Sequence, residues 1–186
     1  ADVRALRRSH GARLREDGVE TVFSHIEMPL CAVLHDMERA GFLVDAQELS
    51  RLGSQYREKL AGLTERIYEL AGETFNINSP KQLGELLFDK MGLPGGKKTQ
   101  RGYSTDAQVL ESLAGQFEIA ARILEYRKIH KLNSTYIEAL LRLRGADGRI
   151  HTSFDQVATA TGRISSLEPN LQNIPVRSEM GREIRR

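Results

Sequence analysis

The chain has 186 residues, 40% of them hydrophobic, which is enough to bury a core in one or two compact units and excludes a disordered chain. With 27 Lys and Arg against 25 Asp and Glu, the net charge of +2 does not by itself indicate a polyanionic partner. A single cysteine excludes an intrachain disulfide, and the lack of a signal-peptide pattern or of an apolar run of about 18 residues predicts a cytoplasmic protein without membrane contact.

The N-terminal part of the chain predicts two helices. Arginines dominate Val3 to Glu16, with few large apolar anchors, which is typical of a solvated helix. Apolar side chains then recur at helical spacing from Leu30 to Met37, and Gly41 ends that helix. Cys31 lies in this apolar run, so we expect it to have a packing role.

A long amphipathic helix is predicted between Asp45 and Gly72. Asp45 and Glu48 form the pattern of a capping box, and a glycine is a typical C-terminal stop. Between them, apolar residues alternate spacings of three and four, as in a coiled-coil seam of about seven turns. The seam consists of Leu49, Leu52, Tyr56, Leu60, Leu63, Ile67 and Leu70. Such a stripe needs a partner to pack against.

Two shorter helices are predicted on either side of a basic loop. Ser79 and Gln82 match a capped start with a proline at the first helical position. Thr105 and Gln108 repeat the capping pattern for a second short helix. Residues 94–105 contain three glycines and no acid, which predicts a mobile basic loop. Its cations are Lys97, Lys98 and Arg101.

The last third of the chain predicts a long helix followed by strands. Residues 117–144 form one helical pattern, in which basic and hydroxyl side chains share one side at about 100 degrees per residue. This strip consists of Arg127, Lys128, Lys131, Thr135 and Arg142. After the Asp147-Gly148 turn, alternation from Ile150 to Phe154 predicts a strand. A second strand is expected across Thr159 to Ser165, paired with the first around a bend at residues 156–158.

A polar but nearly uncharged segment extends from Thr159 to Pro175. Gly162 and Pro169 interrupt regular structure on either side of Arg163, so donors should project from a strand end and a turn. Arginine, asparagine and glutamine can donate to the acceptor that every base pair presents in the minor groove, which checks duplex shape without reading sequence. The alternative is that the polar side chains only cap turns and that Arg163 is a salt-bridge partner.

Three elements could hold DNA phosphates without sequence preference. The first is the start of the Ser79 helix, where free amides and Lys81 could receive a phosphate. The second is the basic loop at residues 94–105, and the third is the strip that includes Lys128. Each has an ordinary alternative, namely a capped helix, a solvated loop and a solvated face, so these patterns alone leave the question open.

Several strings resemble a known family. TATGRISS, PNLQNIPVR and GREIRR, within residues 159–186, resemble the start of the palm in bacterial family A DNA polymerases, the DNA polymerase I or Klenow-type enzymes. SPKQL, KKT with GYST, and EYRKIHKLNSTY resemble the thumb of that family, and IEMPL resembles the segment before it. The resemblance implies a mainly α fold, an antiparallel long-helix thumb bundle with a small β-hairpin region at the C-terminal end that starts an α+β palm. It divides the chain into the tail of an exonuclease-like domain (1–25), the thumb (26–148) and the start of the palm (149–186).

The resemblance also implies contacts with primer-template duplex DNA that do not depend on sequence. The matching backbone contacts are Ser79, Lys81, Lys97, Lys98, Thr99, Arg127, Lys131 and Thr135, and Lys128 joins them by its place on the same strip. The matching contacts in the minor groove near the primer terminus are Arg163, Thr161, Asn170, Gln172, Asn173 and Arg177. Arg101 and Tyr103 fall in a variable part of the loop and receive no assignment.

The parent enzyme implied by this resemblance adds deoxynucleotides to a primer, using two Mg²⁺ ions held by carboxylates. In the family, those carboxylates and the fingers come after GREIRR, and Asp155 and Glu168 are single acids. We therefore expect a monomeric fragment that binds duplex DNA, holds no cofactor and is inactive alone, from a bacterial parent that associates with the nucleoid. The rival hypothesis is a helical protein-interaction scaffold with an incidental basic surface. A nuclease remnant is disfavoured because the acids for that chemistry are missing.

Overall fold

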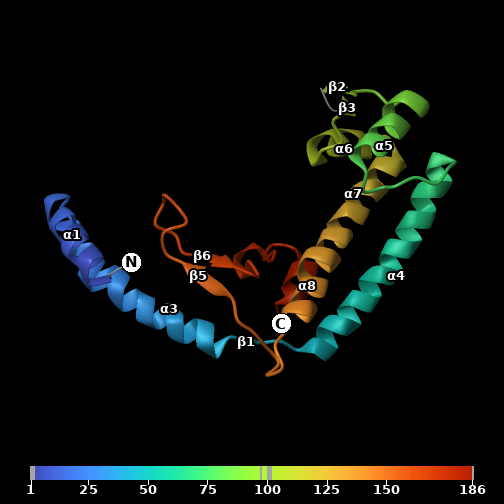
Figure 1. Ribbon diagram of the computed structural model, residues 1–186. Coiled ribbons are helices and arrows are strands. Elements are labelled where there is room, and N and C mark those ends of the chain that lie inside the picture. Colours follow the sequence, from blue (N-terminus) through green and yellow to red (C-terminus); the bar gives the residue numbers. More distant parts are fainter. Residues whose placement is uncertain (1–2, 97, 100–101, 186) are drawn as a thin grey trace. The chain divides into compact units, whose positions relative to one another are not determined.

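The computed structural model describes residues 3–96, 98–99 and 102–185 (Figure 1). This part of the chain is mainly helical with short antiparallel strand pairs, as predicted, and none of its helices is both long and apolar enough to cross a membrane. It forms two compact units. The first contains residues 3–44 and 143–174, and the second contains residues 45–142 and 175–185. The domain division implied by the resemblance, at residues 25 and 148, stays a prediction.

The first unit begins with helices that follow one another closely. They are α1 (Val3–Glu16), α2 (Glu20–Val22), the π-helical segment η1 (Phe23–Glu27) and α3 (Met28–Ala40). Gly41 ends α3 as predicted, because its φ of 63° suits glycine and its N–H donates to the Met37 carbonyl at 2.9 Å. The chain then forms β1 (Phe42–Leu43), which pairs antiparallel with β4 (Arg149–Ile150).

Cys31 is exposed on α3, so its predicted packing role is wrong. Its thiol donates a hydrogen bond to Gln156 Oε1 at 3.0 Å. The helix buries Leu34, whereas Val33 and Met37 are exposed. The apolar run is therefore wider than the stripe that faces the core, and Cys31 lies outside that stripe.

The hairpin of the first unit is displaced from its predicted position. β5 (Ser153–Asp155) pairs antiparallel with β6 (Ser165–Leu167), so the second strand begins where the prediction ended it. Residues just before β6 form a turn, in which Gly162 has a φ of 73° and the Thr159 hydroxyl donates to the Arg163 carbonyl at 2.7 Å. The turn keeps this backbone out of the strand ladder. A short 3₁₀ segment, η4 (Leu171–Asn173), follows β6.

The second unit is built on two long helices. Its elements are α4 (Ala46–Ala71), α5 (Pro80–Gly84), the π-helical segment η2 (Glu85–Lys90), β2 (Lys98–Thr99), β3 (Gly102–Tyr103), α6 (Ala107–Ala114), α7 (Glu118–Lys131), the π-helical segment η3 (Leu132–Ile137), α8 (Glu138–Leu143) and α9 (Glu179–Ile184). Arg66 pairs with Glu118 at 2.9 Å, and a Cβ added at Gly53 would lie 3.2 Å from Ile137 Cγ2. The helical path through α7 and η3 thus runs antiparallel to α4. It is the partner that the apolar seam predicted.

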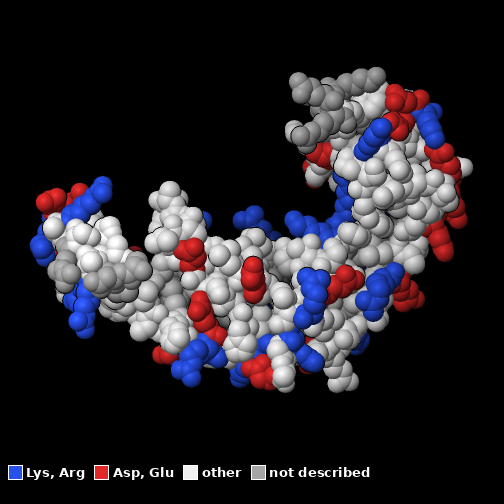
Figure 2. Space-filling view, viewed as in Figure 1, with Lys and Arg blue, Asp and Glu red and all other residues white. Residues whose placement is uncertain are grey.

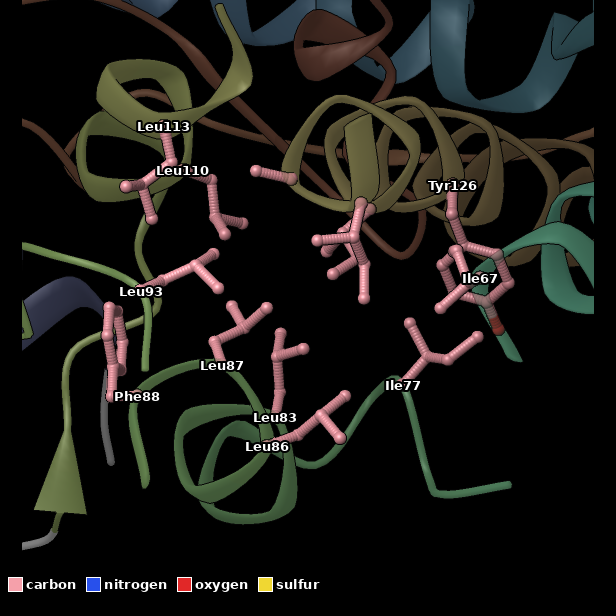
Figure 3. Packing of buried hydrophobic residues seen from close by; sticks show 13 residues of the cluster. Ile67, Ile77, Leu83, Leu86, Leu87, Phe88, Leu93, Leu110, Leu113 and Tyr126 are labelled. Carbon is pink, nitrogen blue, oxygen red and sulfur yellow. The ribbon is translucent and has the colours of Figure 1, made fainter. Parts of the chain in front are cut away.

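Apolar side chains from α4, η2, α6 and α7 gather in one core, seen from close by in Figure 3. Its buried members are Ile67, Ile77, Leu83, Leu86, Leu87, Phe88, Leu93, Leu110, Leu113, Ile119, Ala120, Ile123 and Tyr126. Nearer the N-terminal end of α4, buried Tyr56 donates its hydroxyl to the Met180 carbonyl of α9 at 3.3 Å. Burial raises the pKa of Tyr56 to about 12, so this hydroxyl stays protonated near neutral pH.

Helix starts follow the predicted capping patterns only in part. Asp45 accepts a hydrogen bond from the Glu48 amide at 2.9 Å, but the Glu48 carboxylate accepts from Arg51 instead of closing the box. The cap of α6 is Asp106, which accepts from the amide three residues later at 2.9 Å. The predicted cap, Thr105, is buried one residue earlier. A carboxylate is the stronger acceptor at the positive end of a helix, which favours Asp106.

Two further segments differ from their predicted form. The helix expected over residues 117–144 contains the π-helical segment η3 between α7 and α8. A π turn contains one residue more than an α turn. Side chains after Lys131 are therefore rotated about the helix axis relative to their positions in a continuous α-helix. The predicted loop at residues 94–105 contains a hairpin, β2 with β3, in which Lys98 lies opposite Tyr103. Tyr103 packs on Phe88 with ring centroids 5.0 Å apart, and its hydroxyl donates to Asp89 at 2.6 Å.

Replacing Ile123 with alanine should lower the free energy of unfolding by about 2–5 kcal/mol, because this fully buried side chain of α7 leaves a cavity when truncated. Urea unfolding followed by far-UV circular dichroism measures the change. The control is Val176→Ala, since Val176 belongs to the same unit and is 54% exposed. Equal losses in both variants would contradict the assigned core.

Candidate nucleic-acid interface

The polar segment of the first unit exposes most of the predicted minor-groove side chains. These are Thr161, Arg163, Asn170, Gln172 and Asn173. Buried hydroxyls fix the backbone beneath them. Thr152 places its hydroxyl 2.8 Å from the carbonyl oxygens of Leu167 and Pro169. Ser166 Oγ accepts from the Leu171 amide at 3.1 Å. The segment therefore presents exposed polar groups on an ordered backbone.

Some of these side chains have partners within the segment. Asn170 Oδ1 accepts from the Gln172 amide at 3.1 Å, so the alternative role of capping a turn is correct for Asn170. Gln172 Nε2 donates to the Ile164 carbonyl at 2.9 Å, which leaves its second N–H. Arg163 is different, because no hydrogen bond or ion pair joins its guanidinium to the other residues that the structure describes. The alternative of a salt-bridge role finds no partner there.

One face of α7 and η3 carries exposed cations and a hydroxyl, namely Lys128, Lys131 and Thr135. Within the described ranges neither lysine forms an ion pair, whereas the acids of α7 pair with arginines, as Glu118 does with Arg66 at 2.9 Å. Figure 2 shows basic side chains along the edge of α7 that is turned away from α4, and more acidic ones along the α4 edge. The charge of these lysines is thus available to an external anion.

Arg127 does not lie in that exposed strip, contrary to the prediction. It is half-buried, and its guanidinium donates from Nη1 to the Thr105 carbonyl and from Nη2 to the Thr105 hydroxyl at 3.2 Å. Burial lowers the pKa of Arg127, and the negative charge of Asp106 partly opposes that change. Helical periodicity predicted the side of α7 on which Arg127 lies. It could not show that residues 104–106 pack against that part of the helix.

At the start of α5, more hydrogen-bonding groups have partners within the protein than predicted. Ser79 Oγ accepts from the Gln82 amide at 3.4 Å, which satisfies one of the N–H groups expected to be free. Asn78 Nδ2 donates to the Tyr126 hydroxyl at 3.2 Å. Lys81 is exposed on the first turn. Of this group, Lys81 is therefore the side chain best placed to meet a phosphate.

The other predicted contacts are distributed differently. Lys97 lies outside the described residues, and Lys98 and Thr99 lie on β2, where the structure describes the backbone. Arg177 is exposed but belongs to the second unit, whereas Arg163 belongs to the first. The predicted minor-groove set thus draws on both compact units.

Lys59 of α4 is an exposed cation that the sequence analysis missed. Together with Lys128 it lines a depression of about 400 Å³ between α4 and α7, which also includes the apolar Ile129 and Met180. The sequence could have indicated that Lys59 lies near α7, because Lys59 directly precedes Leu60 and so flanks the apolar seam on which α7 packs.

The chain is similar to a family model and to several known proteins. The family model described as DNA polymerase family A matches residues 46–186, which is more than half of the chain. The chain belongs to DNA polymerase family A. DNA polymerase I of Lactococcus lactis subsp. lactis (strain IL1403) is 54% identical over 175 residues, covering 94% of this chain and 20% of the relative. DNA polymerase I of Bacillus subtilis (strain 168) is 50% identical over 184 residues, covering 98% of this chain and 21% of the relative.

A solved polymerase structure has the same fold as this family A chain. The POL domain of Pol1 from M. smegmatis, in complex with DNA primer-template and dNTP, matches with a TM-score of 0.86 at 41% identity. The match covers 92% of this chain and 30% of that chain. The family A chain spans about a fifth of the length of the curated relatives it matches.

The Mg²⁺ implied for the parent polymerase has no matching ligand set in the described part of this family A chain. Among residues 3–96, 98–99 and 102–185, no three His, Cys, Asp or Glu side chains are grouped so as to hold a metal ion. Asp155 Oδ1 accepts from the Val157 amide at 2.8 Å and so fixes a turn. The residues described therefore do not fit a metal site.

His151 joins α3 to β4 beside the polar segment. Nδ1 lies 2.8 Å from the Glu38 carbonyl, which can only accept, and Nε2 lies 2.9 Å from Asp147 Oδ2. Both ring nitrogens donate when the imidazole is protonated. The Glu38 carbonyl and then the Asp147 carboxylate raise the pKa of His151. The pKa of Asp147 is lowered, first by the Arg149 amide and then by His151.

The folded pKa of His151 lies above its unfolded value of about 6.5, so its contribution to stability is full below that pH and is lost as pH rises through the folded pKa. The difference in Tm between the wild type and His151→Gln should therefore be larger at about pH 5.5 than at about pH 9. Asp147 stays ionised in this range because its pKa is lowered. Thermal unfolding followed by circular dichroism measures both differences, and equal values would rule out a protonated bridge.

Proposed function

We propose that this chain is the part of a family A DNA polymerase I that holds primer-template DNA, comprising the thumb and the start of the palm. The observation that carries the proposal is the exposed face of α7, where Lys128 and Lys131 have no ion-pair partner among the described residues of a family A chain. The POL domain of M. smegmatis Pol1 was solved with a DNA primer-template, which supports DNA as the partner.

Two kinds of contact hold the duplex in this proposal. In the second unit, Lys81, Lys128 and Lys131 meet phosphates, and the exposed hydroxyl of Thr135 adds a neutral donor. Phosphates are the same at every base pair, so these contacts bind DNA irrespective of sequence. In the first unit, the exposed guanidinium of Arg163 donates to purine N3 and pyrimidine O2 in the minor groove.

The parent polymerase in this proposal adds deoxynucleotides to the primer 3′ end, and bound Mg²⁺ supplies the stabilisation of charge on the triphosphate. The described residues of this chain do not fit such ions. We therefore assign to this chain the binding and orientation of the primer-template, and we propose that it does not extend a primer by itself.

Titration of this chain into a labelled blunt primer-template duplex, followed by fluorescence anisotropy, tests the proposal. Together with the predicted contact Lys98, the four cations that meet DNA in this proposal make about five cationic contacts, so the logarithm of the association constant should fall against the logarithm of salt concentration with a slope of roughly −4 to −5. Lys131→Ala should make the slope shallower by about 0.9. The matched control is Arg51→Ala on α4, because Arg51 pairs with Glu48 and should leave the slope unchanged.

Absence of binding, or binding that ignores salt, would overturn the proposal, since a protein-interaction scaffold has no need of phosphates. Affinities that differ strongly between duplexes of unrelated sequence would count against it as well. Incorporation of nucleotides by this chain with Mg²⁺ would contradict the assignment of the chemistry to the rest of the parent.

Arg163→Ala should weaken duplex binding on the order of tenfold while leaving Tm nearly unchanged, because the side chain is exposed and has no partner among the described residues. Arg163→Lys should give an intermediate affinity, since it keeps the charge but loses the planar fork. Anisotropy and thermal unfolding measure the two effects. A large drop in Tm would show instead that Arg163 supports the fold.

A further inference from the structure

The turn that presents Arg163 is attached at its start to the helices of the first unit. Gln156 directly follows β5 and is partly buried. Its Nε2 donates to the carbonyl oxygen of Glu27 at 3.1 Å and to Glu27 Oε2 at 2.7 Å. Its Oε1 accepts a hydrogen bond from the Cys31 thiol at 3.0 Å. Both polar atoms of the Gln156 side chain therefore have partners on α3 or on the residue just before it.

A second contact joins β5 itself to the same helix (Figure 1). Glu38 Oε1 accepts a hydrogen bond from the Phe154 amide at 2.6 Å. Along the helix, Cys31 lies four residues after Glu27 and Glu38 lies seven residues after Cys31. At about 100 degrees per residue these spacings bring the three side chains to one side of the helix. One face of α3 thus holds both the strand and the bend that follows it.

The turn beyond Gln156 is exposed and closed on itself. The Thr159 hydroxyl donates to the Arg163 carbonyl at 2.7 Å, which is a contact within the turn. Val157 is 89% exposed, so its side chain contributes little packing. The direction in which the turn leaves β5 therefore depends on the hydrogen bonds of Gln156.

We propose that Gln156 is a positioning residue, which directs the turn carrying Arg163 into the minor groove of bound duplex DNA and does not itself contact the DNA. This inference rests on the proposed function. The side-chain amide of Gln156 is bound to Glu27 and Cys31, so a base or a phosphate would have to displace those partners. Its effect on duplex affinity therefore passes through Arg163.

A double-mutant cycle tests this dependence by fluorescence anisotropy. With Arg163 present, Gln156→Ala should lower duplex affinity about threefold to fivefold, the effect of losing one such hydrogen bond. In the Arg163→Ala background the same substitution should leave affinity nearly unchanged, because the contact that Gln156 positions is already gone. Equal losses in the two backgrounds would overturn the inference, since Gln156 would then act independently of Arg163.

An exchange of hydrogen-bonding groups separates positioning from a loss of fold. Gln156→Glu places a second carboxylate against Glu27 and should weaken duplex binding, because like charges repel. Adding Glu27→Gln lets donor and acceptor exchange places, so affinity should recover toward that of the wild type. A double variant that keeps the wild-type Tm yet binds no better than Gln156→Glu would contradict the inference.

Hydrogen exchange measured without DNA reports on the turn directly. The backbone amides of residues 157–163 should exchange faster in Gln156→Ala than in the wild type, because the start of the turn is released. The matched control is Gln47→Ala on α4, where the same change is made at an exposed position of the second unit. It should alter neither this exchange nor duplex affinity.

The outcomes separate this inference from the proposed function. If the wild type does not bind duplex DNA, the proposed function fails and this inference with it. If the wild type binds and Arg163→Ala weakens binding, but Gln156→Ala binds as the wild type does, only this inference fails.

Discussion

The antiparallel packing of α4 on the helical path through α7 and η3 is the interaction on which the second unit depends. Ile67 and Ile123, both fully buried, come from the two helices and belong to the same core. The packing uses one side of α7 and leaves Lys128 and Lys131 on an exposed side. Burial of apolar surface, which is non-directional, therefore determines where the cations are displayed. The proposed DNA-binding face follows from the core.

Local signals predicted much of this fold because they depend on neighbours in sequence. The cap at Asp45, the stop at Gly72 and the apolar seam between them each involve residues within a few positions of one another. The start of β6 and the exposure of Cys31 were wrong for the opposite reason. Both depend on which segment packs alongside, and a single sequence shows the period of a helix or strand but not the surface it faces.

The same distinction between local sequence patterns and tertiary packing applies to the residues of the candidate site. Residue types and the family resemblance indicated Arg163 and Lys131, and both are exposed. At about 100 degrees per residue, Arg127 falls on the same side of the helix as Lys131. Its guanidinium is nevertheless hydrogen-bonded to Thr105, 22 positions earlier in the chain. Lys59 was overlooked because it lies on α4 and reaches the cationic face only through the packing of α4 on α7. The side of a helix on which a residue lies could be predicted from the sequence, whereas the segments that pack against that residue could not.

The second unit is interrupted in sequence, since residues 45–142 are completed by residues 175–185. Tyr56 of α4 is paired with Met180, 124 positions further on. During synthesis on the ribosome, which proceeds from the N-terminus, α4 emerges long before this partner exists. Until α9 has left the exit tunnel, the hydroxyl of Tyr56 lacks its partner on Met180. Closure of the second unit therefore waits until residues 175–185 have been synthesised, well after α4 has emerged.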